Sequence, residues 1–208
     1  MKKFLIMSAT ALSISALGTF VADTGVINTN QNMVYAKKYK PNKAVTTDIE
    51  TGSGWLVGQD IKPGVYNLST STGSGNVSSD GASELNIILG TAPDPEMGQL
   101  SNYRVILKKG ESIDISGIPS VHFEAAQFSK PVSSGQLSAG DYKVGRDIKP
   151  GRYTISLVEG SGNISTDDGT LNEILDTDTS MGVTKTTVRL HKGTKLTFDA
   201  QTVQLDRH

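Results

Sequence analysis

The sequence contains one segment twice. Residues 57–66, Val-Gly-Gln-Asp-Ile-Lys-Pro-Gly-Val-Tyr, return as residues 144–153, Val-Gly-Arg-Asp-Ile-Lys-Pro-Gly-Arg-Tyr, with eight of the ten positions identical. Further along, residues 73–80 correspond to residues 160–167 at the same offset. A repeat of about 85 residues is too long for a solenoid unit and long enough for a small domain with its own core. The repeat therefore predicts a duplicated small domain.

Both copies show the alternation of apolar and polar residues that is typical of half-buried β-strands, for example at residues 66–68 and 153–157. The Lys-Pro-Gly sequences at 62–64 and 149–151 favour type II turns, because Pro fixes its own φ and Gly accepts the positive φ that follows. The best helix candidates are too short to decide: residues 84–89 and 171–175. We predict an all-β fold of two tandem small antiparallel β-sandwich or barrel-like domains.

The N-terminus has the pattern of a secretory signal peptide. Lys2 and Lys3 precede a nearly uncharged run at residues 4–22, and a small-residue cleavage site, Val-Tyr-Ala, ends at Ala36. An uncleaved anchor is the alternative, since about 19 apolar residues can just span a bilayer, but Ser, Thr, Ala and Gly make this run weakly hydrophobic. We expect a secreted or cell-surface protein that meets the membrane only through this segment before cleavage.

Composition shifts and the repeat set the expected domain boundaries. The stretch after the signal peptide is polar and ends in Thr-Gly-Ser-Gly, and the stretch between the copies is rich in Ser, Gly and Pro, as linkers are. We expect the following organisation: signal peptide 1–36, flexible segment 37–54, first β module 55–126, linker 127–140 and second β module 141–208.

The chain has no cysteine and a formal net charge of −1. The absence of cysteine excludes disulfides, lipid attachment through a cysteine and thiol nucleophiles. The near-neutral charge gives no electrostatic basis for nucleic-acid binding. An exported chain of this size without disulfides is typical of Gram-positive bacteria.

The repeated motif Val-Gly-x-Asp-Ile-Lys-Pro-Gly-x-Tyr resembles modules found in exported proteins of Gram-positive bacteria, which are often described only as secreted or cell-surface proteins. The resemblance covers most of residues 55–208. It implies an envelope-associated β module, and it carries no established catalytic or binding residue to this chain.

Groups able to support catalysis are few. None of the histidines, His122, His191 and His208, has the spacing of a zinc site. The serines lie in predicted turns, outside the Gly-x-Ser-x-Gly context of a serine nucleophile. Four carboxylates of the first copy could converge for glycoside hydrolysis, with no counterpart arrangement in the second copy: Asp94, Glu96, Asp114 and Glu124. We predict no catalytic residue, no cofactor and no enzyme activity.

Two kinds of binding site are considered. Four loop carboxylates offer hard oxygen ligands for calcium, without the spacing of a twelve-residue calcium loop, and turn formation is the competing explanation: Asp167, Asp168, Asp176 and Asp178. Trp55 and Tyr142 occupy equivalent positions in the two copies, and exposed aromatic faces there could stack on sugar rings. Strand parity instead favours inward positions for both rings.

Together these observations favour an exported, non-enzymatic envelope or extracellular binding protein with two repeated β modules. A cell-wall glycan is the favoured target, because two linked sites gain apparent affinity for a repetitive polymer. Two alternatives stay open. One is a structural protein whose sheet edges associate with other copies or another surface protein, and the other is a cell-wall hydrolase.

Overall fold

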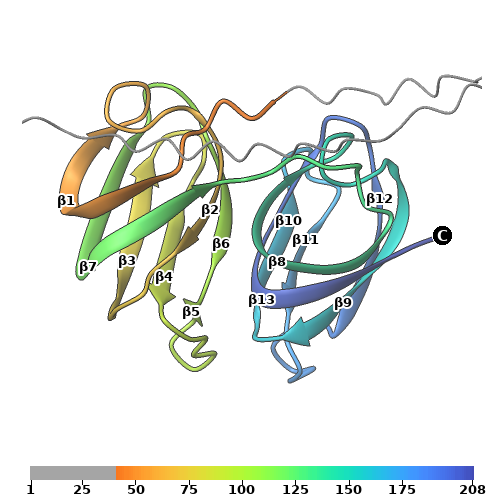
Figure 1. The fold of residues 1–208 in the computed structure, drawn as a ribbon. Coiled ribbons are helices and arrows are strands. Elements are labelled where there is room, and N and C mark those ends of the chain that lie inside the picture. Colours follow the sequence, from red (N-terminus) through yellow and green to blue (C-terminus); the bar gives the residue numbers. More distant parts are fainter. Residues whose placement is uncertain (1–40) are drawn as a thin grey trace, which may run out of the picture. The chain divides into compact units, whose positions relative to one another are not determined.

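All regular structure in the described part of the chain is β-strand. The structure, a computed structural model, describes residues 41–208, so the predicted signal peptide lies outside the described residues. No helix occurs among residues 41–208, which confirms the prediction of an all-β fold and leaves no helix there that could cross a membrane (Figure 1). The strands are β1 (Thr47–Leu56), β2 (Gly64–Ser69), β3 (Ser74–Asp80), β4 (Asn86–Gly90), β5 (Gln99–Leu100), β6 (Tyr103–Leu107), β7 (Ser112–Ala125), β8 (Ser134–Lys143), β9 (Gly151–Glu159), β10 (Gly162–Thr166), β11 (Asn172–Leu175), β12 (Lys185–Leu190) and β13 (Lys195–Arg207).

The strands form two sets with the same pairing scheme, which we call the first β-group (β1–β7) and the second β-group (β8–β13). In the first, the long strand β7 pairs with β1, β2 and β3; in the second, the long strand β13 pairs with β8, β9 and β10. The outer strands match as well, since β6 pairs with β2 as β12 pairs with β9, and β4 with β3 as β11 with β10. The repeated sequence is therefore accompanied by a repeated order of strand pairing.

One mixed sheet of thirteen strands contains both groups. The link is a parallel pairing of β6 with β8 at Arg104 and Gly140, and β4 also pairs with β5 in parallel. The prediction of purely antiparallel sheets is wrong at these two places. A Cβ on Gly140 would overlap the Arg104 backbone, so only glycine permits this approach. Both groups belong to one compact unit of the chain, and their duplication as two domains stays a prediction.

Two segments that the sequence predicts as irregular contain strands. β1 begins at Thr47, inside the expected flexible segment 37–54, and β8 begins at Ser134, inside the expected linker 127–140. Both are rich in Gly, Ser and Thr and have few buried side chains along their first halves, so apolar alternation does not reveal them. Their backbones pair with β7 and β13 instead. The helix candidates lie mostly in strands β4 and β11: residues 84–89 and 171–175.

Each group has its own apolar cluster. The first is built mainly on β2, β3, β4, β6 and β7, and the second on β9, β10, β12 and β13. Tyr66 and Tyr153, the last residues of the two motif copies, are completely buried in these clusters. Their hydroxyls donate to the carbonyl oxygens of Lys62 (2.6 Å) and Lys149 (2.7 Å). Because a buried phenol requires a partner, each tyrosine ties its Lys-Pro-Gly segment to a core.

The motif aspartates have the same local role in both groups. The carboxylate of Asp60 accepts the backbone N–H of Leu56 at 2.8 Å, and that of Asp147 accepts the backbone N–H of Lys143 at 2.8 Å. Each therefore closes the turn that follows the first strand of its group, as short carboxylate side chains often do.

The turn itself differs from the predicted type II turn at Pro-Gly. Positive φ angles occur at Gly58 (104°) and Gly145 (95°), whereas Gly64 and Gly151 begin strands β2 and β9 without a positive φ. The chain therefore reverses at the Val-Gly-x-Asp part of the motif, and the proline leads into the next strand. Proline suits that place because its missing N–H is not required at the start of a strand.

Candidate functional site

A cleft of about 850 Å³ lies between the two β-groups. Strand β6 and the turn before β4 line it from the first group, and β8, β10 and β13 line it from the second. Its uncharged polar lining consists of Ser, Thr, Asn and Tyr side chains. Its charged lining comprises four cations and four anions: Lys108, Lys143, Arg146, Lys195, Glu84, Asp141, Asp167 and Asp199.

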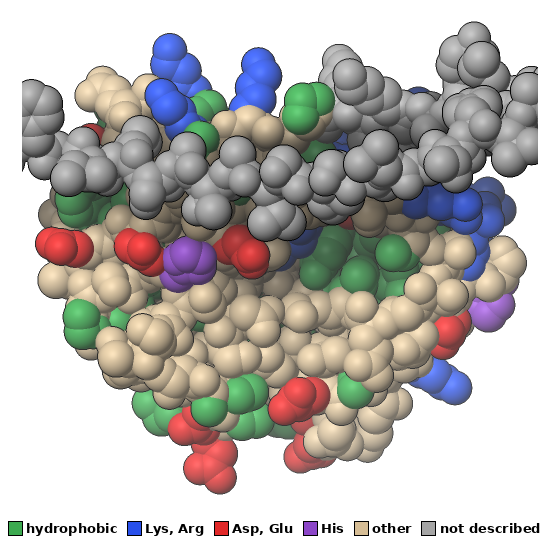
Figure 2. All heavy atoms as spheres, viewed as in Figure 1, with side chains coloured by type: hydrophobic (Ala, Val, Ile, Leu, Met, Phe, Trp, Pro, Cys, Tyr) green, Lys and Arg blue, Asp and Glu red, His purple; other side chains and the backbone are tan. Residues whose placement is uncertain are grey.

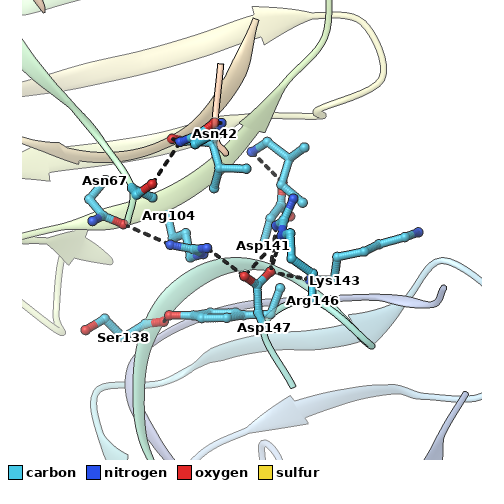
Figure 3. Close-up of polar contacts among 12 residues, drawn as sticks. Asn42, Asn67, Arg104, Ser138, Asp141, Lys143, Arg146 and Asp147 are labelled. Atoms are coloured by element: carbon cyan, nitrogen blue, oxygen red, sulfur yellow. Dashed lines mark hydrogen bonds and ion pairs between the residues drawn. The ribbon is translucent and has the colours of Figure 1, made fainter. Parts of the chain in front are cut away.

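Asp141 of β8 forms the most deeply buried charged group of the cleft, with 1% of the residue exposed. Its carboxylate accepts the hydroxyl of Thr197 at 2.7 Å and the backbone N–H of Ile106 at 3.3 Å, and it lies 3.7 Å from the ammonium of Lys195. Burial raises the pKa of Asp141, while Lys195 and the hydrogen bonds act in the opposite direction. Asp141, labelled in Figure 3, thus connects β6 of the first group with β13 of the second and lines the cleft.

Asp199 is the second carboxylate of the inner wall. Lys195, Thr197 and Asp199 alternate along β13, and this spacing places them on one face of the strand. Burial raises the pKa of Asp199; a hydrogen bond from Asn163 lowers it, and the nearby charge of Asp141 raises it again. Among residues 41–208, no Lys, Arg or His lies within ion-pair distance of Asp199.

Tyr103 of β6 faces these carboxylates from the first group. The residue is 4% exposed and contributes to the wall of the cleft. Burial raises the pKa of its phenol, and the negative charges of Asp141 and Asp199 raise it further. Tyr103 is therefore a neutral hydroxyl beside two acidic groups, able to donate a hydrogen bond and to present an aromatic edge.

Three of the four cations in the cleft already have partners among the described residues. Their ion pairs are Lys143 with Asp167 at 3.6 Å, Lys195 with Asp141 at 3.7 Å, and Arg146 with Asp147 at 2.6 Å. The fourth cation, Lys108, and the acidic Glu84 are exposed to solvent. Glu84 is also the only residue other than glycine with a positive φ in residues 41–208, at 52°. The uncompensated charge on the inner wall is therefore that of Asp199.

Arg104 connects the two groups beside the cleft (Figure 3). Its guanidinium donates to Asp147 of the second motif copy at 2.8 Å and to Asn67 of β2 at 3.4 Å. The side chains of this ion pair are 12% and 9% exposed, so the charges are largely withdrawn from water. The second oxygen of Asp147 binds Arg146, which adds a second cation to the same carboxylate. Arg104 has no counterpart in the repeat, where the equivalent position is Thr187, so the sequence pattern does not distinguish it.

Tyr142, one of the two aromatic binding candidates, lies at this contact between the groups. The guanidinium carbon of Arg104 lies 5.3 Å from its ring centroid, which is a cation–π distance. The ring also stacks with Phe198, with 5.7 Å between centroids and 8° between planes. Its hydroxyl donates to the Ser138 carbonyl at 2.8 Å. Tyr142 is thus buried, with 8% of the residue exposed, and its ring is engaged by protein groups.

Trp55, the other aromatic candidate, lies on β1 and packs partly buried against the first apolar cluster. Its indole Nε1 is buried and has no hydrogen-bond partner among the described residues. A Cβ on Gly52 would come 3.3 Å from that nitrogen, so the indole lies over the glycine. The structure does not bring Trp55 and Tyr142 to one site: neither residue lines the cleft, and each packs with a different apolar cluster.

The four calcium candidates are engaged in loop hydrogen bonds. Asp168 accepts the backbone N–H of Thr170 at 3.1 Å, the hydroxyl of Thr170 at 2.7 Å and the hydroxyl of Thr194 at 2.9 Å. These hydrogen bonds lower the pKa of Asp168. Asp178 similarly accepts both groups of Ser180, which lowers its pKa. Within residues 41–208, no group of three or more His, Cys, Asp or Glu side chains has the geometry to hold a metal ion. Asp167 and Asp176 accept backbone N–H groups of Lys195 and Asp178.

The carboxylates considered for hydrolysis are distributed over different elements. Asp94 accepts the N–H groups of Glu96 and Met97 in a turn, and Asp114 accepts the N–H of Gly54. Neither belongs to the lining of the cleft. Figure 2 shows mostly uncharged polar surface on the face it draws, with charged side chains of both signs dispersed over it.

Comparison of the chain with protein-family models, with curated proteins and with solved structures finds no match.

Proposed function

We propose that this chain is an exported, non-enzymatic binding protein whose cleft between the two β-groups holds a polar polymer, with a cell-wall glycan as the favoured ligand. The observation that carries the proposal is the lining of the cleft, where hydroxyl, amide, carboxylate and ammonium groups surround a cavity of about 850 Å³. A saccharide presents donors and acceptors on every ring, and a cavity with many convergent polar groups can satisfy them.

The charge of the cleft supports a ligand that is not strongly anionic. The lining contains four cations and four anions, and the half-buried cation Lys195 is already paired with Asp141. A polyphosphate would gain little attraction and would have to approach two carboxylates of the inner wall, Asp141 and Asp199. An uncharged or amine-bearing saccharide meets no such repulsion.

Export is supported by the sequence of residues 1–36, with a charged start, an apolar run and a small-residue cleavage site. An exported protein encounters the cell envelope first. The wall glycan is a repetitive polymer at high local concentration, which compensates for a modest affinity at a single open cleft.

The test is co-sedimentation of the purified chain with isolated cell walls, with an assay of the supernatant for released sugar. Ser165 of β10 lines the cleft, whereas Ser156 of β9 is equally half-buried and lies outside it. We expect saturable binding without release, loss of binding in Ser165→Arg, and retained binding in Ser156→Arg, which adds the same charge. Equal binding by both variants would exclude the cleft, and release of soluble sugar would favour the hydrolase alternative.

A further inference from the structure

The strongest unexplained feature of the cleft is the carboxylate of Asp199. It lies on the inner wall between Asn163 and Asp141, and among residues 41–208 it has no cationic partner within 4.0 Å. The other charges of the cleft differ from it in this respect. Asp141 and Asp167 each pair with a lysine, and Glu84 is exposed to water, which screens its charge.

A partly buried carboxylate without a counter-ion is costly, because the folded chain removes water from it and supplies no opposite charge. The neighbouring carboxylate of Asp141 adds repulsion, and the reduced tendency of Asp199 to ionise reflects both effects. A cation that enters the cleft relieves this cost and gains a charge-assisted hydrogen bond. The phenol of Tyr103, the carboxamide of Asn163 and the hydroxyl of Thr197 line the same cavity and can bind the hydroxyls next to such a cation.

Resting on the function proposed above, we infer that the ligand is a saccharide carrying a free primary amine, whose ammonium group binds Asp199. The cleft would then discriminate between amino sugars by their acetylation. A free ammonium donates to the carboxylate and neutralises it, whereas an N-acetyl group carries no charge and adds bulk at the same position. No metal and no covalent step is involved.

The experiment is calorimetric titration of the purified chain with two probes of equal length, a glucosamine tetramer and an N-acetylglucosamine tetramer, at about pH 6, where a primary amine is protonated. The variant Asp199→Asn keeps the shape of the side chain and removes its charge. Asp206→Asn is the matched control, since Asp206 lies on the same strand, is exposed and does not line the cleft.

We expect the native chain and Asp206→Asn to bind the glucosamine tetramer about tenfold or more tightly than the acetylated one, as a charge-assisted hydrogen bond provides. In Asp199→Asn this preference should disappear. Equal affinity of the native chain for both tetramers, binding of neither, or a preference retained in Asp199→Asn would each overturn the inference. Co-sedimentation with cell walls tests the proposed function independently of this titration. If the chain binds walls but the titration contradicts the amine preference, the proposed function stands and the inference fails. If the chain does not bind walls, the proposed function and the inference both fail.

Discussion

The two motif aspartates allow a comparison within one chain. Asp60 and Asp147 accept the same turn hydrogen bond at the same distance, 2.8 Å, but only Asp147 also binds Arg104 and Arg146. Replacing either by Ala removes the turn hydrogen bond, for which about 0.5–2 kcal/mol is expected from similar capping groups. Asp147→Ala additionally leaves the largely buried Arg104 without its carboxylate partner.

The additional cost follows from burial. Breaking a buried ion pair costs about 3–5 kcal/mol when the remaining charge cannot reach water. Arg104 keeps the 3.4 Å hydrogen bond to Asn67 and the Tyr142 ring, and its side chain is 12% exposed, which reduces the cost to about 2–3 kcal/mol. We therefore expect Asp147→Ala to lower the free energy of unfolding by about 2 kcal/mol more than Asp60→Ala.

Urea unfolding followed by far-ultraviolet circular dichroism measures this difference, because strands of both groups contribute to the signal. A double-mutant cycle with Arg104→Ala separates the ion pair from the turn: in the Arg104→Ala background, the costs of Asp60→Ala and Asp147→Ala should become similar. Equal costs in the native background would refute the reasoning, since they would mean that the contact between the groups contributes nothing to stability.

Two further predictions concern the cores and the cleft. Tyr66→Phe and Tyr153→Phe each remove one hydroxyl that donates to a lysine carbonyl. Each should lower the free energy of unfolding by about 1 kcal/mol, measured by thermal or urea unfolding. A cost in only one of the two variants would show that the two motif copies are not equivalent. Asp199 has a raised pKa in the folded chain relative to the ordinary value of 3.8, so its ionisation opposes folding. Relative to the native chain, Asp199→Asn should gain stability as the pH rises from about 4 through the raised pKa, because only the native chain must then ionise this group. Urea unfolding midpoints at each pH measure this difference in stability. A difference that does not change with pH between 3 and 8 would contradict the burial effect.

The sequence predicts the parts of this fold that depend on apolar alternation and repetition. The core strands around Tyr66 and Tyr153 follow directly from the pattern. β1 and the first half of β8 do not, because their side chains are mostly exposed and their positions depend on backbone pairing with β7 and β13. A strand of that kind has no periodic signature.

The cleft was not predicted for a related reason. Its groups come from β6, β8, β10 and β13, and they meet where the parallel contact of β6 with β8 and the Arg104–Asp147 pair join the two groups. The aromatic pair and the loop aspartates are visible in the sequence because they repeat or cluster along the chain. Arg104, Asp141 and Asp199 do neither, and their importance depends on neighbours far away in the sequence.

The contact made by Arg104 also has a direction. It joins β6 of the first group to the motif turn of the second, so the two surfaces involved are different, as in a heterologous interface. Strand pairing places Arg104 opposite Asn67, and the equivalent pair in the second group is Thr187 opposite Thr154. The second group therefore lacks the cation that would receive another motif aspartate. The two groups thus share a motif and divide the roles at their contact: the first supplies the cation, and the second supplies the aspartate.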